Sequence, residues 1–137
     1  MQHAASPDPR AQQEARDWIA RGTEDIQVAE LTLRASPALL GTSVFHSQQA
    51  AEKVLKAFLA AHQVRFRLVH DLVELHGQCQ GLDEEFAVFA AAAHPLTPYA
   101  TQFRYPGGLV GPSRADAEEA FQLAQKLFGF VRTRLGQ

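Results

Sequence analysis

The sequence predicts an all-α fold, an antiparallel up-and-down bundle of four to five helices, and three observations support this prediction. The chain is rich in alanine and has few runs of β-branched residues. Its strongest periodicities repeat every three to four residues. Three long segments carry apolar stripes, and each stripe must bury itself against another element. A length of 137 residues with 46% hydrophobic content fits one domain, residues 1–137, with residues 1–8 frayed.

The first predicted helix begins at Pro9, with Asp8 as its N-cap. Ser36 and Pro37 then signal the start of a second helix, which runs to about Ala61. The two helices should form an antiparallel hairpin. The apolar stripe of the first helix consists of Ala11, Ala15, Trp18, Ile19, Gly22, Ile26, Ala29 and Leu33.

The middle of the chain carries weaker helical signals. Residues 62–70 form a connector with an alternating pattern that fits extended backbone. Asp71 is a cap for a short helix that Gly77 should stop, and Asp83 caps another helix before Pro95. A further helical segment, PYATQFRY, leads into PGGLVGP, whose glycine and proline content predicts a loop.

The last helix has the clearest signals. Ser113 is its N-cap, acidic residues lie in its early turns, and Arg132 and Arg134 lie near its end, which matches the helix dipole. Its apolar face consists of Ala117, Ala120, Phe121, Ala124, Leu127, Phe128, Val131 and Leu135.

Composition limits the classes of function. A formal charge of −2 and a pI near 6.3 provide no long-range positive field, so any contact with RNA or nucleotide must be local. Cys79 is the single cysteine and has no disulfide partner, which indicates a reducing compartment. No apolar run approaches the roughly 20 residues that span a bilayer. The N-terminus lacks a secretory signal, so we expect a cytoplasmic protein.

Metal and hydrolase chemistry find little support in the sequence. Di-iron bundles need Glu-x-x-His motifs, and the chain has none. His62, His70 and His76 are better explained as ordinary polar residues than as metal ligands. Cys79 has no evident activating base. We therefore expect no metal and no cofactor.

The stretch FHSQQAAEKVLKAFL, residues 45–59, mixes polar side chains into a helix. A helical wheel gives it a core face with Gln48 at its edge, and beside this face a second strip that includes a Glu–Lys pair four residues apart. The strip is either a solvated face or a semi-buried contact surface, and periodicity does not decide between them. The core face is Val44, Ser47, Ala51, Val54, Leu55 and Phe58, and the strip is Phe45, Gln49, Glu52, Lys56 and Leu59.

Three motifs follow one another along the chain: FHSQQAAEKVLKAFLAAH at 45–62, HDL at 70–72 and RYP at 104–106. Together they resemble the HEPN domain, a small prokaryotic helical domain often encoded beside a minimal nucleotidyltransferase. The resemblance extends from about residue 15 to residue 135. It implies a bundle of four or five helices that is usually dimeric, similar to the C-terminal domain of aminoglycoside nucleotidyltransferases.

The resemblance implies a HEPN-domain protein that acts with a separate minimal nucleotidyltransferase, in a toxin–antitoxin-like or nucleotide-transfer pair. In that case the polar strip serves a shared site or a dimer surface. The candidate residues for binding nucleotide or RNA are Gln49, Glu52, Lys53, Lys56, Arg104 and Tyr105. Alternatively, Tyr105 packs the glycine-rich loop onto the bundle and Arg104 pairs with an acidic residue such as Glu52.

Many HEPN proteins are metal-independent endoribonuclease toxins whose active motif is an Arg and a His separated by four to six residues. Arg65 and His70 have this spacing. His70 would act as general base or acid, and Arg65 would neutralise the phosphorane. Phe66 departs from the polar residue that usually follows the Arg. The alternative is structural, with His70 bonded to backbone near Asp71 and Arg65 solvated.

The family resemblance also predicts a homodimer. Four large apolar residues lie outside the main core stripes of the predicted helices and are spare for such an interface: Phe45, Leu59, Leu123 and Phe130. Enzymatic activity is left open by the sequence, with the endoribonuclease as the alternative to a binding module.

Overall fold

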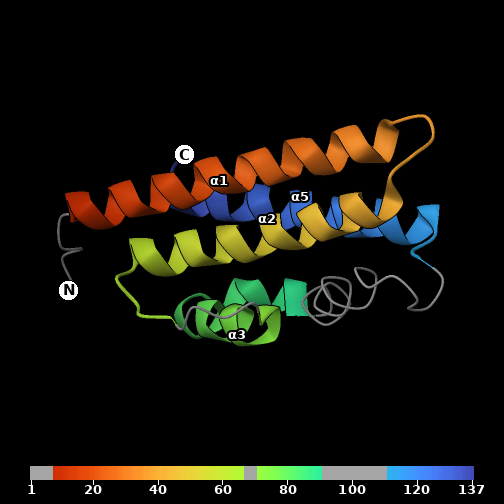
Figure 1. Cartoon of the computed structure of the whole chain (residues 1–137). Helices are drawn as coiled ribbons and strands as arrows, with labels where there is room; N and C mark the ends of the chain where they lie inside the picture. The colour runs from red at the N-terminus through yellow and green to blue at the C-terminus, as the bar shows by residue number, and fades with distance from the viewer. Residues whose placement is uncertain (1–7, 67–70, 91–110) are drawn as a thin grey trace.

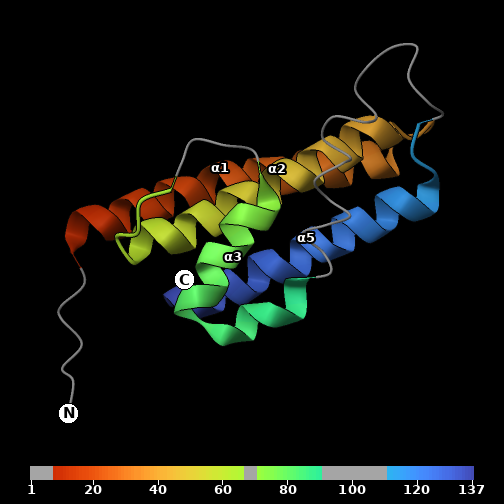
Figure 2. The ribbon, with the colours of Figure 1, turned by 90° about the horizontal axis from the view of Figure 1, so that it is seen from below.

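A computed structural model describes residues 8–66, 71–90 and 111–137. Within these ranges the secondary structure is entirely helical, so the predicted all-α fold is confirmed. The elements are α1 (Pro9–Arg34), α2 (Leu40–Ala61), α3 (Leu72–Leu82), the 3-10 helix η1 (Glu84–Phe89) and α5 (Arg114–Leu135). The helix α1 runs antiparallel to α2, as predicted, and also to α5 (Figure 1). The shorter α3 lies across the long helices (Figure 2).

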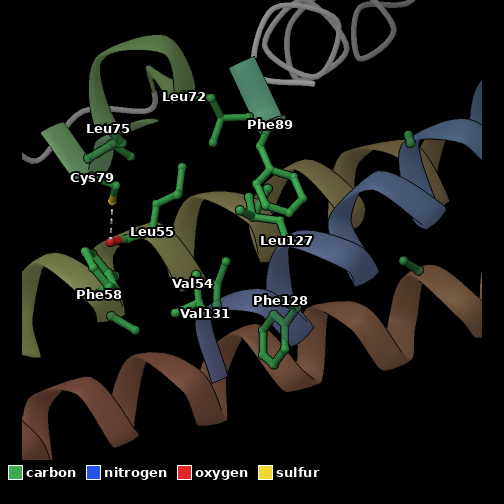
Figure 3. Close-up of a cluster of buried hydrophobic side chains, with 14 of the residues drawn as sticks. Val54, Leu55, Phe58, Leu72, Leu75, Cys79, Phe89, Leu127, Phe128 and Val131 are labelled. Atoms are coloured by element: carbon green, nitrogen blue, oxygen red, sulfur yellow. Dashed lines mark hydrogen bonds between the residues drawn. The ribbon is translucent and has the colours of Figure 1, made fainter. Parts of the chain in front are cut away.

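The central element is α2, which packs against α1, α3 and α5. Every residue from 54 to 60 is buried, so no face of this part of the helix is left to solvent. Leu55 and Phe58 meet Leu75 of α3 and Val131 of α5 in one apolar cluster (Figure 3). Burial of this kind removes apolar surface from water on all sides of α2 and holds the bundle together.

Four predicted helix caps are confirmed. Asp8 accepts a hydrogen bond from the Arg10 amide (2.9 Å), and Asp71 accepts from the amides two and three residues further on. Asp83 caps η1 through the Glu85 amide (3.0 Å). Ser113 and Asp116 form a reciprocal capping box at the start of α5, with two bonds of 3.0 Å. In every cap the donor and the acceptor lie two or three residues apart, so local chemistry fixes these starts.

The predicted start of α2 is wrong by a few residues. The helix begins at Leu40, and Leu39 provides no capping side chain. Tertiary contacts hold this end: the Leu39 amide donates to the Thr32 carbonyl (2.8 Å), and Ser43 Oγ donates to the Ala29 carbonyl (2.8 Å). Both acceptors belong to α1, so the hairpin itself decides where α2 starts.

The predicted stop at Gly77 is also wrong, because α3 continues to Leu82. Gly77 is exposed, whereas His76 before it and Cys79 after it are buried. His76 Nε2 donates to the Phe86 carbonyl of η1 (2.6 Å). Packing on the inner face therefore carries the helix past a glycine that lies on the outer face.

The end of the helix capped by Asp83, the segment PYATQFRY and most of the loop PGGLVGP lie outside the described residues. In the described part of this region, Glu84–Phe89 form the 3-10 helix η1. In the ranges that the structure describes, no helix combines the length and the apolar character needed to cross a membrane.

Candidate functional site

A polar cluster joins α1 to α2 around Asp25. This carboxylate is 6% exposed and lies on the inner side of α1. Its Oδ1 accepts from His46 Nδ1 (2.7 Å), and its Oδ2 accepts from Lys53 Nζ (2.5 Å). His46 and Lys53 are about a quarter exposed, so both polar groups reach toward solvent while Asp25 does not. The cluster is a hydrogen-bonded clamp between the two helices.

Lys53 is one of the predicted binding residues, whereas Asp25 and His46 are not among them. A signal was present in the pattern, because Asp25 lies three residues after Gly22 and four before Ala29, within the apolar stripe of α1. A carboxylate on a buried stripe needs a partner from a facing helix. Lys53 therefore has a structural partner in this bundle, and its proposed ligand-binding role remains a prediction.

A second polar group lies inside the bundle along α2. Lys56 Nζ donates to Glu52 Oε2 (3.1 Å), and these two residues are 4% and 2% exposed. Gln48 donates to the other Glu52 oxygen (3.4 Å) and accepts from Gln49 Nε2 (2.9 Å). Of the two alternatives for the polar strip, the interpretation of Glu52 and Lys56 as a solvated face is wrong, because both side chains are buried. Gln49 is half-buried, so it alone in this chain of bonds lies at the surface.

Lys56 is covered by two aromatic rings. Its ammonium lies 5.3 Å from the ring centre of Trp18 and 5.9 Å from that of Phe66. The rings meet edge to face, with 6.1 Å between centroids. The wheel of α2 did not show this burial, because the covering rings come from α1 and from the connector after α2. A ligand that touches the Lys56 ammonium directly would first have to displace these rings.

A surface hollow lies beside these rings, where the N-terminal part of α1 meets the end of α2. Trp18, Phe66, Arg10, Glu14 and Arg65 are among its lining residues. Ala11, Ala60 and Val64 contribute an apolar floor. Glu14 accepts from the Trp18 indole nitrogen at 3.4 Å, a long contact. The hollow thus combines half-buried aromatic surface with charged groups at its rim.

Arg65 is exposed at this hollow, and its carbonyl accepts from Gln78 Nε2 (3.2 Å). His70, Arg104 and Tyr105 lie outside the described residues. The structure therefore places five residues of the predicted site: Arg65, Gln49, Glu52, Lys53 and Lys56. Arg65 lines the same hollow as Phe66, and the Lys56 ammonium lies 5.9 Å from the Phe66 ring centre. The predicted catalytic and binding roles stay predictions.

The other reactive side chains in the described ranges bond within the protein. His62 Nδ1 donates to the Phe58 carbonyl (3.0 Å), and His76 donates to backbone as described above. Cys79 is fully buried, its Sγ donates to the Leu55 carbonyl (3.6 Å, Figure 3), and burial raises the pKa of its thiol far above the ordinary value. A protonated, buried thiol is not a nucleophile. Among the described residues no group of three or more His, Cys, Asp or Glu side chains is placed to hold a metal ion.

Comparison with solved structures finds the same fold. The crystal structure of TT1696 from Thermus thermophilus superposes with a TM-score of 0.74 at 30% identity, over 88% of this chain and 97% of that one. The crystal structure of ST0689, an archaeal HEPN homologue, gives a TM-score of 0.73 at 23% identity, over 89% of this chain and 98% of that one. No curated protein matches the chain.

The family comparison covers most of the described helices. Residues 15–134 match the HEPN domain, a range that includes the Asp25 clamp, the Glu52–Lys56 pair and Arg65. The chain therefore belongs to the HEPN domain family.

Proposed function

We propose that this HEPN protein acts with a separate minimal nucleotidyltransferase, as the HEPN half of a toxin–antitoxin-like or nucleotide-transfer pair, and that it binds nucleotide or RNA. The observation that carries the proposal is the family match over residues 15–134. The bundle supports a binding role in one further respect: among the described residues, the reactive groups Cys79, His62 and His76 are all engaged with backbone carbonyls.

Surface available to a protein partner is present on the described elements. Five large apolar side chains are exposed. The two most exposed are Leu31 in α1 (72%) and Val88 in η1 (76%). Single exposed apolar residues are common on monomers, so their number alone identifies no interface. The full set is Leu31, Leu39, Val73, Leu82 and Val88.

Affinity capture of the tagged chain from its native host, followed by mass spectrometry, tests the partnership. A small nucleotidyltransferase should be enriched over capture with an unrelated helical bundle. Leu31→Glu and Val88→Glu, each checked for intact helicity, then locate the contact, because a charge placed in an apolar interface weakens it. Repeated capture without any nucleotidyltransferase would contradict the proposal.

A metal-independent endoribonuclease is the second candidate, and the exposed guanidinium of Arg65 is the observation that favours it. Cleavage of mixed RNA in EDTA should then occur with the wild-type protein and be lost in Arg65→Ala and in His70→Ala. Arg34→Ala is the matched control and should cleave normally, because Arg34 ends α1 whereas Arg65 lies beside the start of α1. Absence of cleavage by the wild-type protein would remove this candidate.

A homodimer is part of the same proposal, and it rests on the family. The four apolar residues named for its interface are not all spare: Leu59 is fully buried in the core, and Leu123 and Phe130 pack partly buried against it. Phe45 is half-buried. Sedimentation at micromolar concentration should give twice the mass of the chain, and a monomer at that concentration would count against the dimer.

A further inference from the structure

The carboxylates and the guanidinium groups of the hollow at Trp18 differ in whether they have a hydrogen-bond partner. Both of its carboxylates accept from neutral donors, Asp8 from the Arg10 amide (2.9 Å) and Glu14 from the Trp18 indole in a long contact (3.4 Å), and are engaged to that extent. Neither guanidinium is: within the described residues the side chains of Arg10 and Arg65 form no hydrogen bond or ion pair. Two unpaired guanidinium groups at one hollow are a ready site for an anion, because each offers a planar fork that matches phosphate.

The same hollow offers aromatic surface. Trp18 and Phe66 are half-buried and meet edge to face, so part of each ring lines the opening. Buried Lys56 packs against both rings and is paired with Glu52, so it supports the position of the aromatic pair without adding net charge to the hollow. A base stacked on such a ring contributes roughly 1–3 kcal/mol without regard to sequence. The cavity volume is about 520 Å³, within the range of roughly 300–1,000 Å³ typical of small-molecule sites.

We infer that this hollow is a nucleotide subsite, in which a base packs on Trp18 and Phe66 and its phosphate binds Arg65 and Arg10. The chemistry recognised is an aromatic base joined to phosphate, from a free nucleotide or from single-stranded RNA. The inference rests on the nucleotide-or-RNA part of the proposed function and is independent of the nucleotidyltransferase partner. It also places the ligand away from Lys56, which the two rings cover, and from the buried carboxylate of Glu52.

Trp18 is the single tryptophan of the chain, so its fluorescence reports directly on this site. The wild-type protein is titrated with ATP, adenosine, tripolyphosphate and a short oligoadenylate, with excitation at the red edge of the indole band to limit absorption by the nucleotide. Calorimetry repeats each titration without an optical signal. ATP or oligoadenylate should quench the emission, and adenosine and tripolyphosphate should each bind at least about tenfold more weakly because each carries half of the contacts.

Variants separate this site from general charge attraction. Arg65→Gln should weaken binding about tenfold or more, the effect expected on losing a hydrogen bond to a charged group. Arg34→Gln removes the same charge 16 residues from Trp18 along α1, about 24 Å at 1.5 Å per residue, and should change Kd by no more than about twofold. By calorimetry, Trp18→Phe should keep the affinity within about threefold and Trp18→Ala should lose it. Circular dichroism checks that every variant folds.

The results distinguish the ligand source and can overturn the inference. Binding of ATP identifies a free-nucleotide site, and binding of oligoadenylate alone identifies an RNA site. The inference fails if neither ligand produces quenching or heat at millimolar concentration, if tripolyphosphate binds as well as ATP, or if Arg34→Gln weakens binding as much as Arg65→Gln. None of these failures affects capture of a nucleotidyltransferase, so the partnership is tested separately.

Discussion

Gly22 lies where α1 meets the ring of Phe128 on α5. A Cβ at this position would stand 2.7 Å from Phe128 Cε2, closer than real Cβ contacts allow. Gly22→Ala should therefore destabilise the protein by about 1 kcal/mol, because overpacking costs about 1–3 kcal/mol and better helix propensity returns at most about 1 kcal/mol. Urea unfolding followed by circular dichroism measures the difference.

Gly129 provides the matched control for this prediction. It lies inside α5, it is exposed, and apart from its chain neighbours and the nearby backbone of α5 no atom of the described chain lies within 4 Å of an added Cβ. Gly129→Ala should stabilise the protein by about 0.5–1 kcal/mol, since only the helix propensity changes. Equal effects of the two substitutions would mean that the Phe128 ring moves aside freely.

Asp25 is the residue on which the α1–α2 clamp depends. Asp25→Ala removes the shared acceptor of His46 and Lys53 (2.7 and 2.5 Å). A fully buried pair would cost about 3–5 kcal/mol to break, but both partners are partly exposed, so we expect a loss of about 1–3 kcal/mol. Asp17→Ala on the same helix is the control. Asp17 is exposed, and its one bond among the described residues is from Gln13, so a change within about 0.5 kcal/mol is expected. Equal unfolding midpoints for the two variants would show that the clamp contributes nothing.

At this scale the sequence is a good guide to the caps and a poor guide to buried polar residues. Asp8, Asp71 and Ser113 bond to amides two or three residues away, so the local sequence contains both partners. The burial of Lys56 depends on Trp18 and Phe66, and neither of these residues belongs to α2. A helical wheel of α2 contains no information about those rings.

Among the elements, α5 has a start determined by its own residues. The side chain of Ser113 accepts from the Asp116 amide, and the Asp116 carboxylate accepts in return (both 3.0 Å). Ser113→Ala should lower the free energy of unfolding by about 1 kcal/mol, because an amide of the first turn loses its acceptor. Thermal and urea unfolding measure this loss.

Ser113→Asp is the control for the cap, because aspartate is an equally good N-cap residue and should retain the wild-type stability. If Ser113→Ala and Ser113→Asp unfolded at the same urea concentration, the capping box would not be what stabilises the start of α5.

The start of α2 and the end of α3 differ from α5 in this respect. Leu39 brings no capping group, and bonds to Thr32 and Ala29 of α1 hold the start of α2 in place. In α3 the glycine expected to end the helix points outward, and the buried contacts of His76 and Cys79 continue beyond it. Both boundaries are set by neighbours distant in sequence, which explains why local signals placed them wrongly.

For the molecule as a whole, the all-α class followed from the sequence because each long stripe needs an apolar partner. The arrangement around α2 did not, since it depends on which stripes meet. Polar contacts of Arg134, near the end of α5, add to the packing of the helices. Arg134 bonds Asp83 (2.9 Å), pairs with Glu85 and lies over the Phe130 ring. These contacts tie the end of α3 and η1 to α5, and α3 packs separately against α2.

Cys79 reports whether this assembly unfolds as one unit. It is the single cysteine, it is fully buried between α3 and α2, and its raised pKa keeps the thiol protonated. Because the thiolate is the reactive form, labelling by a thiol reagent requires opening and should be at least about a hundredfold slower in the native protein than in urea.

The same thiol makes the stability of the protein depend on pH. Above the ordinary thiol pKa of about 8.5, only the opened state ionises, so the free energy of unfolding should fall as the pH rises. Cys79→Ala should lack that part of the pH dependence. If the opening free energy from labelling equals that from urea unfolding, α3 belongs to the cooperative core; a clearly smaller value means that α3 detaches from α2 on its own.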